Sequence, residues 1–192
     1  MPPSLKYTPE AIIAAAIKCV EEEGFSALSV RRVAQQFDGS PQPIYSQFKT
    51  RKALDKAVLN QMFHTLVAYT DQNFSSHKFL NIGVGVVVFA REHPKLFQGL
   101  CLNPVYSAVS IERIIRYHIR LLKDLPEFTK FSAKDLRELV LKRWVYIYGL
   151  ATLVSFDLFK EPSDRNIMRN IKTSGLPILS AAISKNRKRG KL

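Results

Sequence analysis

Residues 29–48, SVRRVAQQFDGSPQPIYSQF, contain two short helix patterns separated by a tight turn. One helix is predicted over 29–37 and another over 40–48, and both Asp38 and Gly39 between them accept left-handed backbone conformations readily. The side chains expected to share one core are Val30, Val33, Phe37, Ile44 and Phe48. This arrangement is typical of a helix-turn-helix, whose second helix enters the major groove of DNA.

Two prolines stand at the start of the second helix. The first turn of a helix has amides without intrahelical partners, so Pro41 at the first position and Pro43 at the third forfeit no helical hydrogen bond. Ser40 is predicted to be the N-cap, with its hydroxyl accepting from the amide of Gln42. Because Gln42 precedes a proline and is biased away from helical geometry, the helix must absorb that strain or begin one residue later.

Gln42 is the side chain best suited to direct base readout, because its amide can pair with N6 and N7 of adenine. The predicted DNA-binding residues are Ser29, Arg31, Ser40, Pro41, Gln42, Pro43, Tyr45, Ser46, Gln47, Lys49 and Arg51. The prolines can lie against thymine methyls, Arg31 can reach a guanine or a phosphate, and those from Tyr45 onward are better placed for phosphates. Taken singly, each has a simpler interpretation: an exposed glutamine, a solvated cationic face, or a tyrosine packed on the first helix.

The rest of the chain also has helical patterns. Thr8-Pro9-Glu10 is a helix start and Gly24 a helix end, and Thr50 begins a long helix that reaches about Asp71. Further helices are predicted over 78–92, 95–102, 107–124, 132–160 and 164–186. The run at 82–90 has strand propensity, but no partner strand is evident, so a helix is favoured. Ser132 and Asp135 resemble a capping box, and Pro177 should kink or restart the last helix. The chain is therefore predicted to be all-α.

The net charge of +13 favours a polyanionic partner. Residues 1–60 hold 8 Lys and Arg against 6 Asp and Glu, whereas residues 61–192 hold 21 against 10. The tail cations are Lys185, Arg187, Lys188, Arg189 and Lys191. They are interpreted as a frayed, solvated tail, with a nucleic-acid contact as the alternative.

Several classes of protein are disfavoured. The sequence shows no signal peptide, and the apolar run 144–159 carries Asp157, which indicates a buried helix rather than a membrane span. Cys19 and Cys101 lie in apolar contexts, which indicates a reducing, cytoplasmic location. No metal-ligand spacing, paired carboxylates, catalytic triad or phosphate loop stands out, so neither a metal, a cofactor nor enzymatic activity is expected.

Residues 8–58 resemble the DNA-binding domain of the TetR family of transcriptional regulators. The resemblance lies in the first helix with Gly24, the Ser29-Val30 entry to the second helix, Ala34, and the run from Ser40 through Ile44-Tyr45-Ser46-Gln47-Phe48-Lys49-Thr50-Arg51. The family's turn glycine falls on Asp38, and its frequent Gly-Thr pair is Gln42-Pro43, so no operator sequence carries over.

The resemblance implies an N-terminal three-helix helix-turn-helix domain, residues 1–60, joined to a larger helical effector-binding and dimerisation domain, residues 61–192. It further implies a homodimer through helices 132–160 and 164–186 on a pseudo-palindromic double-stranded DNA operator, usually as a repressor released by a small-molecule effector. Effector candidates are Phe89, His93, Phe97, Tyr106, Arg113, Arg116, Tyr117, Arg120, Trp144 and Tyr148. The stripe of Arg113, Arg116 and Arg120 fits either a solvated face or an anionic effector. A basic architectural DNA-binding protein without an effector is the alternative function.

Overall fold

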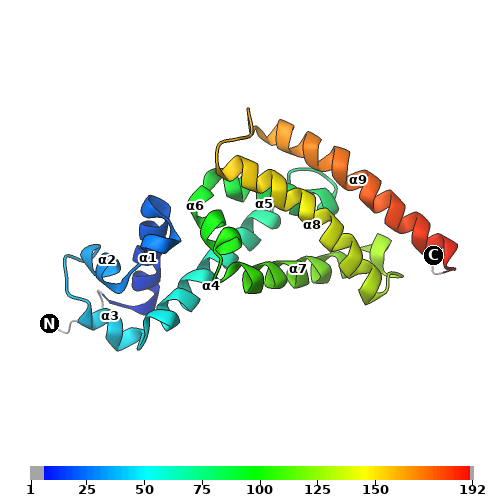
Figure 1. The fold of residues 1–192 in the computed structure, drawn as a ribbon. Coiled ribbons are helices and arrows are strands. Elements are labelled where there is room, and N and C mark those ends of the chain that lie inside the picture. Colours follow the sequence, from blue (N-terminus) through cyan, green and yellow to red (C-terminus); the bar gives the residue numbers. More distant parts are fainter. Residues whose placement is uncertain (1–6, 191–192) are drawn as a thin grey trace.

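Helices joined by short turns make up the computed structural model, which describes residues 7–190, and no β-strand occurs in that range. The α-helices are α1 Pro9–Glu23, α2 Val30–Gln35, α3 Gln42–Gln47, α4 Arg51–Thr70, α5 Lys78–Glu92, α6 Pro94–Phe97, α7 Ser107–Lys123, α8 Ala133–Ser155 and α9 Asp164–Lys188. Shorter turns are η2 Phe25–Ala27, η3 Gln98–Leu102 and η4 Pro126–Phe128. In Figure 1, α1–α3 form a small headpiece, and α4 connects it to a larger body of α5–α9. The predicted all-α class is confirmed.

Side-chain caps define where most helices begin. The hydroxyls of Thr8, Ser29, Thr50, Ser132 and Ser163 each accept from the amide three residues on, at 3.1–3.3 Å. Each such cap stabilises its helix by about 1 kcal/mol. These caps confirm the predicted starts of α1, α4 and α8, and the Ser29 cap confirms where the helix-turn-helix begins.

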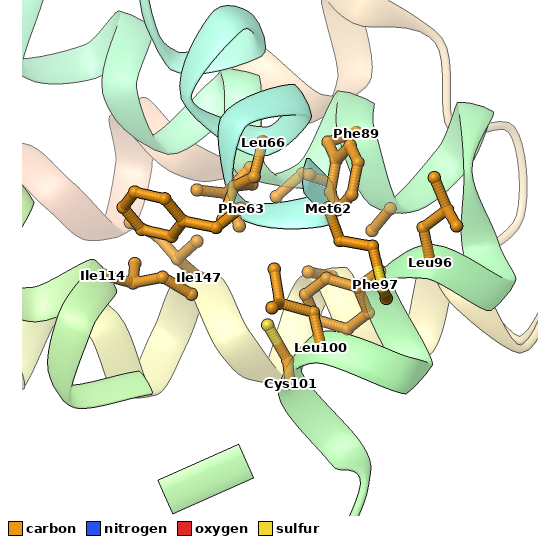
Figure 2. Close-up of a cluster of buried hydrophobic side chains, with 14 of the residues drawn as sticks. Met62, Phe63, Leu66, Phe89, Leu96, Phe97, Leu100, Cys101, Ile114 and Ile147 are labelled. Atoms are coloured by element: carbon orange, nitrogen blue, oxygen red, sulfur yellow. The ribbon is translucent and has the colours of Figure 1, made fainter. Parts of the chain in front are cut away.

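Helix α5 is the centre of the body. Every residue from Phe79 to Ala90 is buried, and the helix packs against α4, α8 and α9. Gly85 permits the close approach to α4, since a Cβ there would lie 2.3 Å from the carbonyl oxygen of Tyr69. Figure 2 shows part of this core, with Phe89 of α5 near Met62 and Leu66 of α4. The run 82–90 is thus helical despite its strand propensity.

Three predicted boundaries in the body need correction. Helix α8 ends at Ser155 rather than at 160, because Asp157 adopts a left-handed conformation (φ 57°) that stops the helix. Pro177 lies within α9, which is continuous to Lys188 and does not restart. The predicted helix 95–102 is the short α6 followed by a wider π-type turn, η3.

The basic end of the chain is folded rather than frayed. Lys185 lies 2.6 Å from Glu138 and Arg189 lies 3.0 Å from Asp135, so both hold α9 against α8. Arg187 and Lys188 are exposed, and Lys191 lies outside the described residues. The predicted frayed tail is therefore wrong for residues 185–189. No helix between residues 7 and 190 has the length and apolar character needed to cross a membrane.

Candidate DNA-binding site

The helix-turn-helix consists of α2, a turn and α3. Val33 and Ala34 of α2 and Ile44 of α3 are at most 1% exposed, and they pack in the headpiece core. The chain reverses at Asp38, whose φ of 51° is left-handed, while the amide of Gly39 donates to the carbonyl of Ala34 at 3.2 Å. Asp38 thus adopts the conformation for which glycine is the usual residue.

The start of α3 differs from the prediction in one respect. The helix begins at Gln42 with Pro41 as its N-cap, and no side chain caps it, so the predicted bond from the Gln42 amide to the Ser40 hydroxyl is wrong. The helix begins one residue later than predicted, so Ser40 precedes the N-cap, and Pro41 at the N-cap has no side-chain acceptor. Pro43 has no amide, and the amides of Ile44 and Tyr45 both donate to the carbonyl of Pro41 at 3.1 Å. The alternative, a helix that begins one residue later, is confirmed.

The outward face of α3 gathers most of the predicted DNA contacts. Ser40, Pro41, Gln42, Tyr45, Ser46 and Lys49 line a shallow surface hollow of about 560 Å³. Tyr45 is 48% exposed, and Gln42, Gln47 and Lys49 are exposed as well. The Ser46 hydroxyl donates to the Gln42 carbonyl at 3.2 Å, which leaves its oxygen free to accept. This face offers donors and acceptors on one short helix and a cation, Lys49, just beyond its end.

Two arginines flank that face differently. Arg31 on α2 is exposed and has no carboxylate within ion-pair distance among residues 7–190, whereas Arg32 pairs with Glu23. Arg51 begins α4, and its Nε lies 2.5 Å from Oδ1 of Asp55. Arg51 therefore lies beside α4 rather than in the hollow on α3.

The sequence of the headpiece matches a known family model. Residues 12–58 match the model described as bacterial regulatory proteins, tetR family. Residues 12–58 are therefore a DNA-binding domain of the TetR type, with the helix-turn-helix of a transcriptional regulator.

Solved structures share the TetR-like fold across most of the chain. A Rhodococcus sp. protein assigned to the TetR-family transcriptional regulators has a TM-score of 0.66 and 17% identity, covering 91% of this chain and 97% of its own. A TetR-like regulator from Rhodococcus sp. RHA1 gives 0.59 and 15%, covering 92% and 98%. RolR in complex with resorcinol gives 0.58 and 17%, covering 89% of each chain. No curated protein matches the sequence.

The predicted effector residues are dispersed over the TetR-type body. Phe89, Phe97 and Trp144 are core side chains, at most 5% exposed, and Figure 2 shows the first two within the apolar cluster. Tyr148 donates to the Cys101 carbonyl at 3.1 Å, and the hydroxyl of Tyr117 donates to Asp71. Tyr148 also packs against two of these core rings, with its ring centre 6.3 Å from that of Phe97 and 5.9 Å from that of Trp144, so these side chains contribute to the packing of the body.

Three other predicted effector residues lie at the surface or at a joint between elements. His93 contacts Glu21 of α1 through Nδ1 at 2.8 Å. Arg116 and Arg120 are both exposed. The Nε of Arg116 lies 3.9 Å from a carboxylate oxygen of Glu112, and the guanidinium of Arg120 lies above the ring of Tyr117. The stripe is therefore divided, because Arg113 faces inward and its guanidinium lies 3.8 Å from the ring centre of Phe63.

Tyr106 and Arg113 do share a cavity, in a groove between α4 and α7 that the sequence did not reveal. Asp55 lies at one end of it and accepts from the Tyr106 hydroxyl at 3.1 Å; burial and the nearby Asp55 carboxylate raise the pKa of Tyr106. Lys52 and Lys56 also line it. Their i, i+4 spacing on α4 places them on one face, but only the fold shows that α7 lies opposite.

Proposed function

We propose that the protein is a homodimeric repressor that binds a pseudo-palindromic DNA operator through α3 and is released by a small-molecule effector. The observation that carries the proposal is the exposed face of α3, where six predicted contact residues line one hollow. The anchoring of α3 through buried Ile44 holds that face in a fixed orientation.

We assign direct base readout to Gln42. Its side chain is exposed at the first turn of α3, the end of a recognition helix that lies nearest the bases. Pro41 and Pro43 beside it would contact thymine methyls. Phosphate contacts are assigned to Ser29, Arg31, Ser40, Tyr45, Ser46, Gln47, Lys49 and Arg51. Among these, Arg31 and Lys49 have no competing carboxylate among residues 7–190, whereas Arg51 would have to leave Asp55.

Dimerisation through α8 and α9 is supported by an exposed apolar face. On α8, Leu141, Val145 and Leu153 recur at helical spacing and are 37%, 72% and 44% exposed. Gly149 lies in the same stripe, and a Cβ there would meet nothing within 4 Å. An apolar stripe of this kind is unfavourable in water and is typical of helix-bundle interfaces.

Effector control is supported by similarity of fold. RolR, whose fold this chain shares, has been solved with resorcinol. The groove between α4 and α7 lies where the body meets α4, the helix that follows α3 in the chain.

The test is selection of bound DNA from a random pool, followed by affinity measurements on the selected site and on bulk DNA. We expect a preference of about 10³-fold or more for the selected palindrome. Gln42→Ala should reduce that preference, with a loss of about 1–3 kcal/mol on the selected site alone. Lys49→Ala should weaken all sequences alike and reduce the dependence on salt.

The same measurements test the rival function, a basic architectural protein. That protein would show no selected sequence, and both substitutions would weaken every DNA equally. Such a result would overturn the assigned roles and the repressor proposal together.

A further inference from the structure

The groove between α4 and α7 has the size and lining of a ligand site. Its volume is about 910 Å³, within the range of about 300–1,000 Å³ typical of small-molecule pockets. Its floor is apolar: Phe63 is 7% and Leu100 is 1% exposed, and both belong to the buried cluster in Figure 2. Val109 of α7 lines one wall and is 72% exposed, so an apolar side chain is left without a partner there.

The charged side chains of the groove are strongly unbalanced. Four cations line it, Arg51, Lys52, Lys56 and Arg113, against the single carboxylate of Asp55. Asp55 is taken by Arg51 at 2.5 Å and by the hydroxyl of Tyr106. In the part of the chain from 7 to 190, the other three cations have no carboxylate within 4.0 Å. Burial against the Phe63 ring lowers the pKa of Arg113, as expected for a cation without an anionic partner.

We infer that this groove binds an amphiphilic organic anion, with an aromatic or aliphatic body on Phe63, Leu100 and Val109 and an acidic group at Arg113 and Lys56. The inference rests on the proposed effector control and gives it a site and a ligand class. An anion would relieve the unpaired charge, while its apolar body would cover surface that water now wets. Neutral or cationic compounds would gain only the burial of apolar surface and not the pairing of charge.

The position of the groove connects it to DNA binding. Its lining comes from α4 as far as Phe63, from Leu100 of η3, and from the start of α7 with the two residues before it. Helix α4 begins only four residues after α3 ends. An occupant would contact Lys56 on α4 and Arg113 on α7 at once, and so set the distance between these helices. The bond from Tyr106 to Asp55 already joins the same two elements at the end of the groove.

The experiment measures binding of 8-anilinonaphthalene-1-sulfonate, a fluorescent aromatic anion, to the full chain without DNA. N-phenyl-1-naphthylamine, its uncharged analogue, is measured in parallel. Arg113→Gln should weaken binding of the anion by about tenfold, as expected for the loss of one charge-assisted contact, and change binding of the uncharged probe less than twofold. Arg116→Gln is the matched control, because Arg116 is exposed on the same helix and does not line the groove.

A second variant tests the apolar part of the site. Val109→Trp would fill the groove from an exposed position and should weaken both probes by tenfold or more. Should Arg113→Gln prove poorly folded, Lys56→Gln replaces it, since Lys56 is exposed and makes no ion pair with the residues described. The inference is overturned if the groove variants and Arg116→Gln bind the anion equally well, or if loss of charge affects both probes alike.

Failure of this site can be told apart from failure of the proposed repressor function. Probe binding needs no operator, and operator selection needs no ligand. A specific anion site together with no selected DNA would support the ligand site and refute the repressor function. A selected operator with unchanged probe binding in all groove variants would support the repressor function and refute the ligand site.

Discussion

Helices α3 and α5 are built on opposite principles. Over Phe79–Ala90 of α5 every residue is buried, while in α3 only Ile44 is buried and the other five residues are exposed or half-buried. The residues of α5 are therefore restricted by the packing of α4, α8 and α9 around them. The choice of residues in α3 is restricted mainly by the DNA that the helix is proposed to bind. Substitutions should consequently affect stability in α5 and ligand recognition in α3, with Ile44 as the exception.

Ile44→Ala should produce the largest local effect, because it removes the single core anchor of α3. Loss of this fully buried side chain should destabilise the headpiece by about 3–4 kcal/mol. Amide hydrogen exchange would show faster exchange in α1–α3 and unchanged exchange in α5. Tyr45→Ala, at the neighbouring exposed position, is the control. Equal acceleration in headpiece and body would mean that the two do not open separately.

Gly85→Ala tests the packing of α5 from the other side. The added Cβ would lie 2.3 Å from a backbone carbonyl of α4, which cannot rotate away, so the two helices must separate. We expect a loss of about 3 kcal/mol in urea unfolding. Gly175→Ala in α9 meets only side chains at 3.7 Å or more, and should be neutral or stabilising by up to about 1 kcal/mol. Similar losses for both would show that helix propensity or flexibility, not contact with α4, restricts Gly85.

A buried histidine gives the body a dependence on acid that the exposed face of α3 lacks. Burial, with the positive Arg143 nearby, lowers the pKa of His118 from about 6.5 to about 3, and its Nε2 has no hydrogen-bond partner among the described residues. The unfolded chain therefore takes up a proton below pH 6.5 that the folded chain refuses until about pH 3. Stability from this group is complete above pH 6.5 and decreases as the pH falls.

His118→Leu should remove that dependence. Between pH 7.5 and 4.5 the loss of unfolding free energy should be about 2–3 kcal/mol smaller in the variant than in the parent chain, as measured by urea titration at both values. His64→Leu, at an exposed position of α4, should leave the pH dependence as it was. If both variants kept the parent's pH profile, His118 would not be the group that refuses the proton.

Some helix starts could be predicted from the sequence, whereas the end of α8 and the groove could not. The Ser29 and Thr50 caps depend on residues three apart, so local patterns sufficed for them. The apolar run in α5 favours a strand locally, and the helix could be predicted there only because no partner strand was evident. The end of α8 was missed because Asp157 takes a left-handed conformation that the sequence does not favour as glycine would. The groove was missed because Lys56 and Arg113 are 57 positions apart in the sequence, and only tertiary packing sets them together.

Two serines in the helix-turn-helix, Ser29 and Ser40, precede the starts of α2 and α3 but differ in whether they cap the helix. Ser29 caps α2 through the amide of Arg32 at 3.1 Å, whereas Ser40 makes no cap because α3 begins at Gln42 with Pro41 in the N-cap position. Ser29→Ala should therefore destabilise the headpiece by about 1 kcal/mol in thermal or urea unfolding, and Ser40→Ala by less than about 0.5 kcal/mol. Any weakening of DNA binding by Ser40→Ala would then report a phosphate contact rather than a damaged helix. An equal loss of stability in both variants would show instead that Ser40 caps α3 in solution, and the prolines would no longer explain how that helix starts.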